Sequence, residues 1–152
     1  MGNPNPGDLC ALYYNTGTDA SPVWVEVTKA KDVSFPIQIG EADSSARDNE
    51  FKTSETTLIG VELTFGYQYE PGADTVFSAL MTMAMARTAK QFAAADGPIA
   101  TTGTNYLKFF GKVFGLNNDQ PLDGVETKEI TVKPVRFYES SVLKKPSWNT
   151  TP

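Results

Sequence analysis

The sequence has 152 residues, of which 40% are hydrophobic, and this suits a single domain with a core of its own. Thirteen basic and eighteen acidic residues give a net charge of −5, which excludes the basic surface that nucleic-acid-binding proteins normally use to neutralise phosphates. One cysteine, Cys10, excludes an internal disulfide, and the absence of histidine excludes Ser-His-Asp and Cys-His catalytic sites and most zinc sites.

The first forty residues divide into an irregular part and a strand-rich part. Residues 1–22 are rich in Gly, Pro, Asn and Thr, and they lack the basic-then-apolar pattern of a signal peptide, so we expect an N-terminal arm with little regular structure. Residues 23–40 contain two strand-like pieces. Pro36 lies inside the second piece and predicts a sheet edge or a bulge there.

Residues 41–56 are polar and charged, and Phe51 is their only large apolar side chain. Sixteen residues are long for a connection between two strands, and long connections in compact domains are usually functional or disordered. The composition fits both a contact loop and a mobile tip. The residues available for contact are Asp43, Ser45, Arg47, Asp48, Glu50, Phe51 and Lys52.

Residues 57–70, TLIGVELTFGYQYE, alternate between apolar side chains and polar or small ones. Successive side chains on a strand point to opposite faces, so the pattern predicts one strand with an apolar face on the core and a wet face opposite. The wet face carries Glu62, Thr64, Gln68 and Glu70.

The next segment predicts the one helix of the chain. Pro71 and Gly72 interrupt the strand, and Asp74 follows as a favourable helix N-cap. Apolar residues then recur at helical spacing, which predicts a helix at about residues 74–87.

The remainder predicts strands again. Residues 90–119 form a strand, a turn at Asp96-Gly97 and a long strand in which Lys108 and Lys112 share one face. Residues 125–137 form a last strand that Pro134 marks as an edge or a bulge. Residues 139–152 are typical of an extended terminal arm.

The sequence offers no convincing catalytic, cofactor or metal site. Glu41 with Asp43, and Asp119 with Asp123, are the close carboxylate pairs that acid–base chemistry would need, but solvated loop acids account for them better. Residues 117–123 lack the spacing and the distal Glu of an EF-hand, and no phosphate-binding glycine pattern occurs. We therefore expect a structural or binding protein that needs no cofactor, not an enzyme.

The order of these features resembles the phage major tail protein family, the tail tube subunits of long-tailed bacteriophages. The stretches that carry the resemblance are VWVEVTKAKDVSF, DSSARDNEFKT leading into the amphipathic strand, DTVFSALMTMAMA, and ITVKPVRFYE behind QPLDG. They cover roughly residues 23–138, which makes that range a tail-tube-like β domain between two arms, residues 1–22 and 139–152.

The resemblance implies a mainly β fold of two packed antiparallel sheets, sandwich- or barrel-like, with one flanking α-helix. It implies hexameric rings that stack into a hollow tube, through which DNA passes without specific binding and without membrane insertion of the subunit. The loop at 41–56 would reach the adjoining ring. The wet face of residues 57–70 would line the lumen, where Glu62 and Glu70 repel phosphate.

The same resemblance implies partners and a location. The partners are further copies of the chain, a tape measure protein and tail terminator or initiator proteins. The location is the virion tail, after synthesis in the host cytoplasm. Lys108 and Lys112 would either weaken the negative field of the lumen or pair with acids across a subunit interface.

Several alternatives fit the same features. Tubes of contractile tails, type VI secretion systems and gene-transfer particles would use a similar subunit. A carbohydrate-binding β-sandwich would need exposed aromatic residues, for which Trp24 and Trp148 are available. A small hydrolase would need one of the carboxylate pairs to share a pocket.

Overall fold

The computed structural model describes residues 4–47, 50–124 and 126–152. Its elements are η1 (Gly7–Leu9), β1 (Ala11–Asn15), β2 (Trp24–Glu26), β3 (Ala30–Ser34), β4 (Ile37–Asp43), β5 (Ser54–Val61), β6 (Leu63–Gln68), α1 (Thr75–Ala86), β7 (Lys90–Ala95), β8 (Asn105–Asp119), β9 (Thr127–Pro134), β10 (Tyr138–Glu139), β11 (Val142–Leu143) and β12 (Ser147–Thr150).

One long strand joins two halves of an antiparallel sheet. The order of the strands is β2-β1-β7-β8-β9-β6-β3, and β12 also pairs with β8. The first half of β8 pairs with β7 and β12, whereas its second half, from Gly111 onward, pairs with β9. An extra residue in β8 between Val113 and Gly115 interrupts the register and accentuates the bend between the halves.

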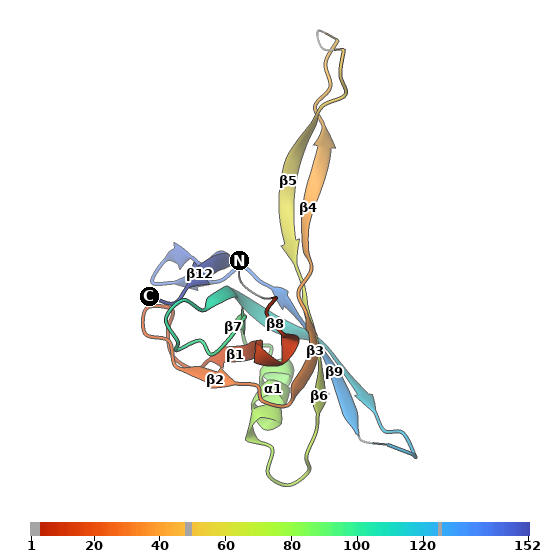
Figure 1. Ribbon diagram of the computed structural model, residues 1–152, viewed down its shortest axis with the longest axis vertical. Coiled ribbons are helices and arrows are strands. Elements are labelled where there is room, and N and C mark those ends of the chain that lie inside the picture. The colour runs from red at the N-terminus through yellow and green to blue at the C-terminus, as the bar shows by residue number, and fades with distance from the viewer. Residues whose placement is uncertain (1–3, 48–49, 125) are drawn as a thin grey trace.

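The main hydrophobic core contains side chains of both sheet halves and of α1, whose arrangement Figure 1 shows, and a smaller buried cluster consists of Tyr13, Ala93, Ala95 and Ile99. Residues on β1, β7 and β8 face residues on β6 and β9 in a single buried cluster. The fully buried large side chains are Tyr67, Phe65, Phe92, Phe109, Leu12, Leu63, Leu80, Ile130 and Val132. The mainly β fold with packed antiparallel layers and one flanking helix is therefore confirmed.

The helix begins and ends close to the predicted residues. Asp74 is the N-cap, and its carboxylate accepts a hydrogen bond from the backbone N–H of Phe77 at 2.9 Å. The same carboxylate accepts from the hydroxyl of Tyr67 at 2.5 Å. Burial would raise the pKa of Asp74, but the hydrogen bonds from Tyr67 and Phe77 outweigh it and lower this pKa. Arg87 ends the helix in the left-handed conformation, with φ of 55°.

The prediction of a single strand at residues 57–70 is wrong. β5 ends at Val61 and β6 begins at Leu63, and the two strands pair in different sheets, so Glu62 lies at a junction. The alternation of apolar residues with polar or small ones continues in the sequence through both strands. The two strands differ in the strand with which each one pairs. In β6 the apolar residues Leu63, Phe65 and Tyr67 are buried as the pattern predicts, but Ile59 of β5 is 65% exposed.

The predicted arms also contain regular structure. β1, within the expected N-terminal arm, lies between β2 and β7, and its Leu12 and Tyr14 are buried in the core. Within the expected C-terminal arm, β10 pairs with β11 and β12 pairs with β8. The turn at Asp96-Gly97 is likewise not a two-residue hairpin, because β7 ends at Ala95 and β8 begins only at Asn105. Ladder hydrogen bonds to strands far away in the sequence order these segments despite their composition.

A polar cluster joins the segments near the two ends of the chain. The carboxylate of Asp19 accepts hydrogen bonds from Gln91 at 2.8 Å, Lys108 at 3.1 Å and Lys144 at 2.9 Å. Burial would raise the pKa of Asp19, but these three donors hold it well below its ordinary value. Lys108 thus has a carboxylate partner within its own chain.

Candidate functional site

The most conspicuous surface feature is a hairpin that extends away from the body (Figure 1). It consists of β4 and β5, which form a two-stranded sheet with each other and pair with no other strand. Its aliphatic side chains are open to solvent: Ile37, Ile39 and Leu58 are 51%, 57% and 88% exposed. A hairpin with open sheet edges and exposed aliphatic residues indicates a surface for another molecule, because exposed strand edges and apolar patches otherwise promote aggregation.

Most of the predicted contact loop is part of this hairpin. Residues 41–43 continue β4 and residues 54–56 begin β5, so the connection is shorter than the sequence predicts. The backbone N–H of Ser44 donates to the carbonyl of Thr53 at 3.0 Å, which extends the pairing toward the tip. The sequence hides this extension because polar residues on a solvated hairpin lack an apolar alternation.

The predicted contact residues lie at or near the tip. Asp43 ends β4, and its carboxylate accepts from the backbone N–H of Ser45 at 2.9 Å. The side chains of Arg47, Glu50, Phe51 and Lys52 are exposed. Asp48 lies outside the described residues.

A bulge in the hairpin separates an apolar part from an acidic part. Gly40 of β4 faces both Thr57 and Leu58 of β5, and a Cβ at Gly40 would lie 2.2 Å from the side-chain hydroxyl of Thr57, so a larger residue would require this hydroxyl to move. Because side chains alternate, Ile37, Ile39, Ile59 and Val61 share one face on the body side of the bulge.

Beyond the bulge the same face becomes acidic. Glu41 and Asp43 follow Ile39 at two-residue spacing, so they belong to the face of Ile37 and Ile39. Ala42 and Glu55, which are cross-strand partners, belong to the opposite face. One face of the hairpin is therefore apolar near the body and negatively charged near the tip.

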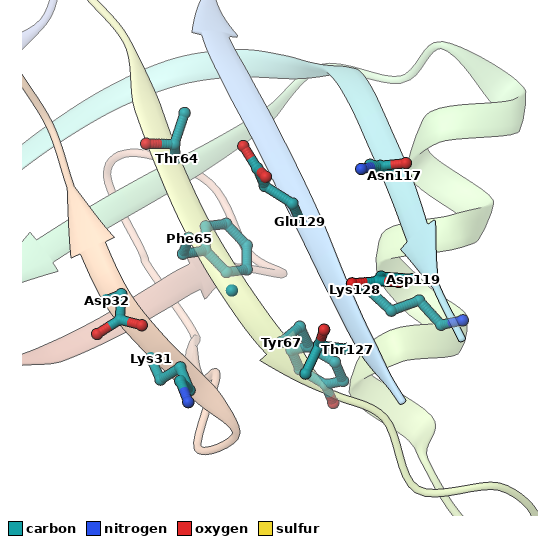
Figure 2. Close-up of a pocket in the computed structure, with 11 residues that line it drawn as sticks. Lys31, Asp32, Thr64, Phe65, Tyr67, Asn117, Asp119, Thr127, Lys128 and Glu129 are labelled. Atoms are coloured by element: carbon teal, nitrogen blue, oxygen red, sulfur yellow. The ribbon is translucent and has the colours of Figure 1, made fainter. Parts of the chain in front are cut away.

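The second candidate surface is a shallow polar trough on the outer face of the β3-β6-β9-β8 half of the sheet (Figure 2). Its volume is about 370 Å³. Cross-strand partners arrange its small and polar residues in rows: Ser34, Thr64, Thr131 and Gly115; Lys31, Gly66, Glu129 and Asn117; and Gln68, Thr127 and Asp119. The large side chains of the same strands, such as Phe65, Tyr67 and Ile130, point away from the trough and are buried in the core.

One of the four residues predicted to face a lumen, Thr64, lines the trough. Gln68 lies on the same face of β6, opposite Thr127, but is not among the lining residues. Glu62 lies at the junction before β6, and Glu70 lies beyond the strand, where its carboxylate pairs with the ammonium of Lys29 at 2.6 Å. The carboxylate of Glu70 therefore already has a cation partner within the chain.

Other strands supply trough residues that the alternation of residues 57–70 does not identify. They are Lys31, Asp32, Asn117, Asp119, Thr127, Lys128 and Glu129. The pattern TKEITV of residues 127–132 contains part of the signal, because Thr127, Glu129 and Thr131 alternate with buried residues. The sequence could not show that this alternating face adjoins that of β6.

A pair of lysines borders the trough at its hairpin end. Lys112 of β8 and Lys133 of β9 are directly opposite each other, and they form the cross-strand pair next to that of Val113 and Val132. The ammonium of Lys133 lies 5.9 Å from the ring centroid of Phe114, which is 60% exposed. None of the ion pairs among the described residues involves Lys112 or Lys133.

The described residues contain no arrangement that indicates catalysis. Glu41 and Asp43 lie on the exposed hairpin, and Asp119 ends β8 while Asp123 lies in the following turn. Within residues 4–47, 50–124 and 126–152, no group of three or more His, Cys, Asp or Glu side chains is placed to hold a metal. In the same ranges no helix is long and apolar enough to cross a membrane.

No protein-family model and no curated protein matches the sequence. Among solved structures, the chain is similar to the SPP1 tail tube, with a TM-score of 0.74 at 9% identity over 97% of this chain and 80% of that chain. It is similar to a chain of the native gene transfer agent virion, with a TM-score of 0.69 at 8% identity over 97% of this chain and 100% of that chain.

A third similar structure comes from the PVC sheath–tube complex, an extracellular contractile injection system in its extended state. The TM-score is 0.63 at 11% identity, over 97% of this chain and 93% of that chain. At these identities the likeness shows the fold, and it confirms the predicted resemblance to tail tube proteins at that level.

Proposed function

We propose that this chain is the structural subunit of a phage tail tube, which assembles as stacked hexameric rings around a conduit for DNA. The observation that carries the proposal is the likeness of 97% of the chain to subunits of tube-bearing particles. The hairpin supports it independently, because its exposed aliphatic residues need a partner that the isolated chain lacks.

The proposal includes the location and partners of the subunit. It is made in the host cytoplasm and resides in the virion tail. Its main partner is a second copy of itself, and the tube ends on terminator or initiator proteins and surrounds a tape measure protein. The solved structures that resemble the chain include a sheath/tube terminator of the PVC system and a tube-terminating cap of the anti-feeding prophage. The role is structural and not enzymatic.

The similar structures include an extracellular contractile injection system, so a tube of a contractile particle stays an alternative. The SPP1 tail tube and the gene transfer agent give TM-scores of 0.74 and 0.69, and the contractile PVC complex gives 0.63. At these identities the scores show the shared fold and do not rank the two kinds of tail. A sheath gene beside the gene for this chain would favour the contractile alternative.

Electron microscopy of the purified protein tests the proposal. At high concentration, or after addition of an initiator complex, we expect hollow tubes of constant diameter with six-fold symmetry in cross-section. A chain that remains monomeric under all these conditions would contradict the proposal.

The trough is our candidate for the lumen wall, and Glu129 tests this placement. Its carboxylate repels phosphate, so tubes of the unchanged protein should leave short duplex DNA in the supernatant when they are pelleted. Glu129→Lys replaces the repulsion with a phosphate-binding cation in every subunit, and we expect DNA to pellet with the tubes at low salt and to be released at high salt.

Glu129→Gln is the matched control, because it removes the negative charge without adding a positive one. We expect Glu129→Gln tubes to retain much less DNA than Glu129→Lys tubes. Equal and negligible retention by all three proteins would place Glu129 outside the lumen.

A further inference from the structure

The paired lysines of β8 and β9 raise an electrostatic problem. Like charges directly opposite each other on neighbouring strands destabilise a sheet. Lys112 and Lys133 are such a pair, and no ion pair of the described residues relieves it. Glu62 directly precedes β6 and adjoins Lys133 in register, because Leu63 is the partner of Val132. The ion pairs of the described residues do not include Glu62, Lys112 or Lys133, so this lysine pair has no ion-pair partner within the described part of the subunit.

The hairpin contains the complementary feature. Glu41 and Asp43 lie on one face of β4, and none of the ion pairs in the described part of the chain includes either carboxylate. Their partners are hydroxyl and backbone groups: Ser54 donates to Glu41, and Ser45 donates to Asp43. Both acids lie in the last three residues of β4, and the β4–β5 hairpin extends away from the body (Figure 1).

We propose that, in the assembled tube, Lys112 and Lys133 receive the acidic face of the hairpin of a second copy, in which Glu41 and Asp43 supply the missing anions. The inference rests on the proposed function and identifies the receiving site for the hairpin. The spacings suit the pairing: residues two apart on a strand are roughly 7 Å apart, opposed residues are about 5 Å apart, and lysine side chains are long enough to cover the difference.

The apolar parts of the two surfaces follow the same order. On the hairpin, exposed Ile37 and Ile39 adjoin the acids along the same face. On the body, exposed Phe114 adjoins Lys133. The same contact would thus cover aliphatic and aromatic surface beside the ion pairs, and burial of that surface favours association.

Covering the lysines also resolves a conflict at the trough. Lys133 lies two residues from Thr131, so the lysine pair borders the face that contains Asp119 and Glu129. Two uncovered lysines there would bind the phosphates that the acids repel. A hairpin carboxylate on each lysine removes that attraction.

Charge reversal on each side separately, and then on both sides, tests the pairing. We expect Lys112→Glu/Lys133→Glu to raise the protein concentration needed for tube formation at least about tenfold, a loss of about 1.4 kcal/mol of contact energy. Glu41→Lys/Asp43→Lys should have a similar effect, because it places like charges together. The chain with all four substitutions should again form tubes near the original concentration.

Two matched controls isolate the site. Lys145→Glu reverses an exposed lysine elsewhere on the body, and Glu55→Lys reverses an acid on the opposite face of the hairpin. Both should assemble like the unchanged protein. Circular dichroism and monomer sedimentation confirm that each variant is folded, and Lys112→Gln/Lys133→Gln serves as a milder substitution if the charge reversal destabilises the sheet.

The outcomes separate this inference from the proposed function. Tubes from Lys112→Glu/Lys133→Glu at the original concentration would overturn the inference and leave the proposed function standing. So would a fourfold variant that remains unable to assemble. Normal tubes of the lysine variant with altered DNA retention would assign the pair to DNA contact instead. Failure of the unchanged chain to form any tube would contradict the proposed function and the inference together.

Discussion

Removal of the β4–β5 hairpin should abolish tube formation and leave the subunit folded. We would replace residues 40–58 with Asn-Gly, which joins the cross-strand partners Ile39 and Ile59 through a two-residue turn. In the described part of the chain β4 and β5 pair only with each other, so the free energy of unfolding should change by less than about 1 kcal/mol, as for other surface changes. Assembly should fail because the removed residues include the bulge and the whole acidic face.

The short hairpin formed by β10 and β11 provides the matched control. β10 and β11 are joined by Ser140 and Ser141, both in the left-handed conformation with φ of 51° and 64°. Asn-Gly fits this turn better than Ser-Ser, so Ser140→Asn/Ser141→Gly should fold, should be slightly more stable and should still form tubes. Chemical denaturation and negative-stain microscopy measure the two properties. Long tubes from the chain without the β4–β5 hairpin would refute the role given to it.

Asp74 should dominate the stability of the monomer. Its carboxylate caps α1 and also accepts a hydrogen bond from the hydroxyl of Tyr67, and only 4% of its side-chain surface is exposed. Asp74→Ala removes the cap, which costs about 1 kcal/mol, and strands the Tyr67 hydroxyl, which costs a further ~1–3 kcal/mol. We expect a total loss of about 2–4 kcal/mol in the free energy of unfolding, measured by denaturant unfolding of the monomer.

A double-mutant cycle separates the two contributions. Tyr67→Phe removes the hydroxyl and should cost about 1 kcal/mol by itself. After that change the Tyr67 hydroxyl is no longer stranded, so Asp74→Ala should cost less, namely the cap together with the weaker contacts to Lys29 and the Glu70 backbone N–H. Asp74→Asn keeps an oxygen acceptor for Tyr67 and Phe77 but loses the charge that pairs with Lys29, so it should cost less than Asp74→Ala without being neutral. Additive losses in the cycle would show that the two side chains are not coupled.

The sequence predicted elements whose signal is local. The helix follows from Asp74 and the spacing of apolar residues, and the buried face of β6 follows from the alternation of Leu63, Phe65 and Tyr67. It did not predict the junction at Glu62, because the alternation has the same period on both sides and only long-range pairing distinguishes β5 from β6.

The surfaces were harder to predict for the same reason. Lys108 and its partner Asp19 are 89 residues apart, and nothing near either residue indicates the pairing. The trough combines residues from four strands, so its composition depends on strand order and register. The exposure of the hairpin residues could be predicted from the polar composition of residues 41–56, but the pairing of β4 with β5 could not.

The manner in which the hairpin joins the body has a mechanical consequence. Only Phe35 and Pro36 separate β3 from β4, and only Glu62 separates β5 from β6. Rotation about these two short joints, with local repacking of Phe35 and Val61 at the core, would tilt the hairpin as a unit while the ladder within it stays intact. When a filament of such subunits curves, the gaps between layers widen on the outer side and narrow on the inner side. Hairpins that pivot where they join the body can follow both changes, so the filament would flex without any layer of subunits being deformed.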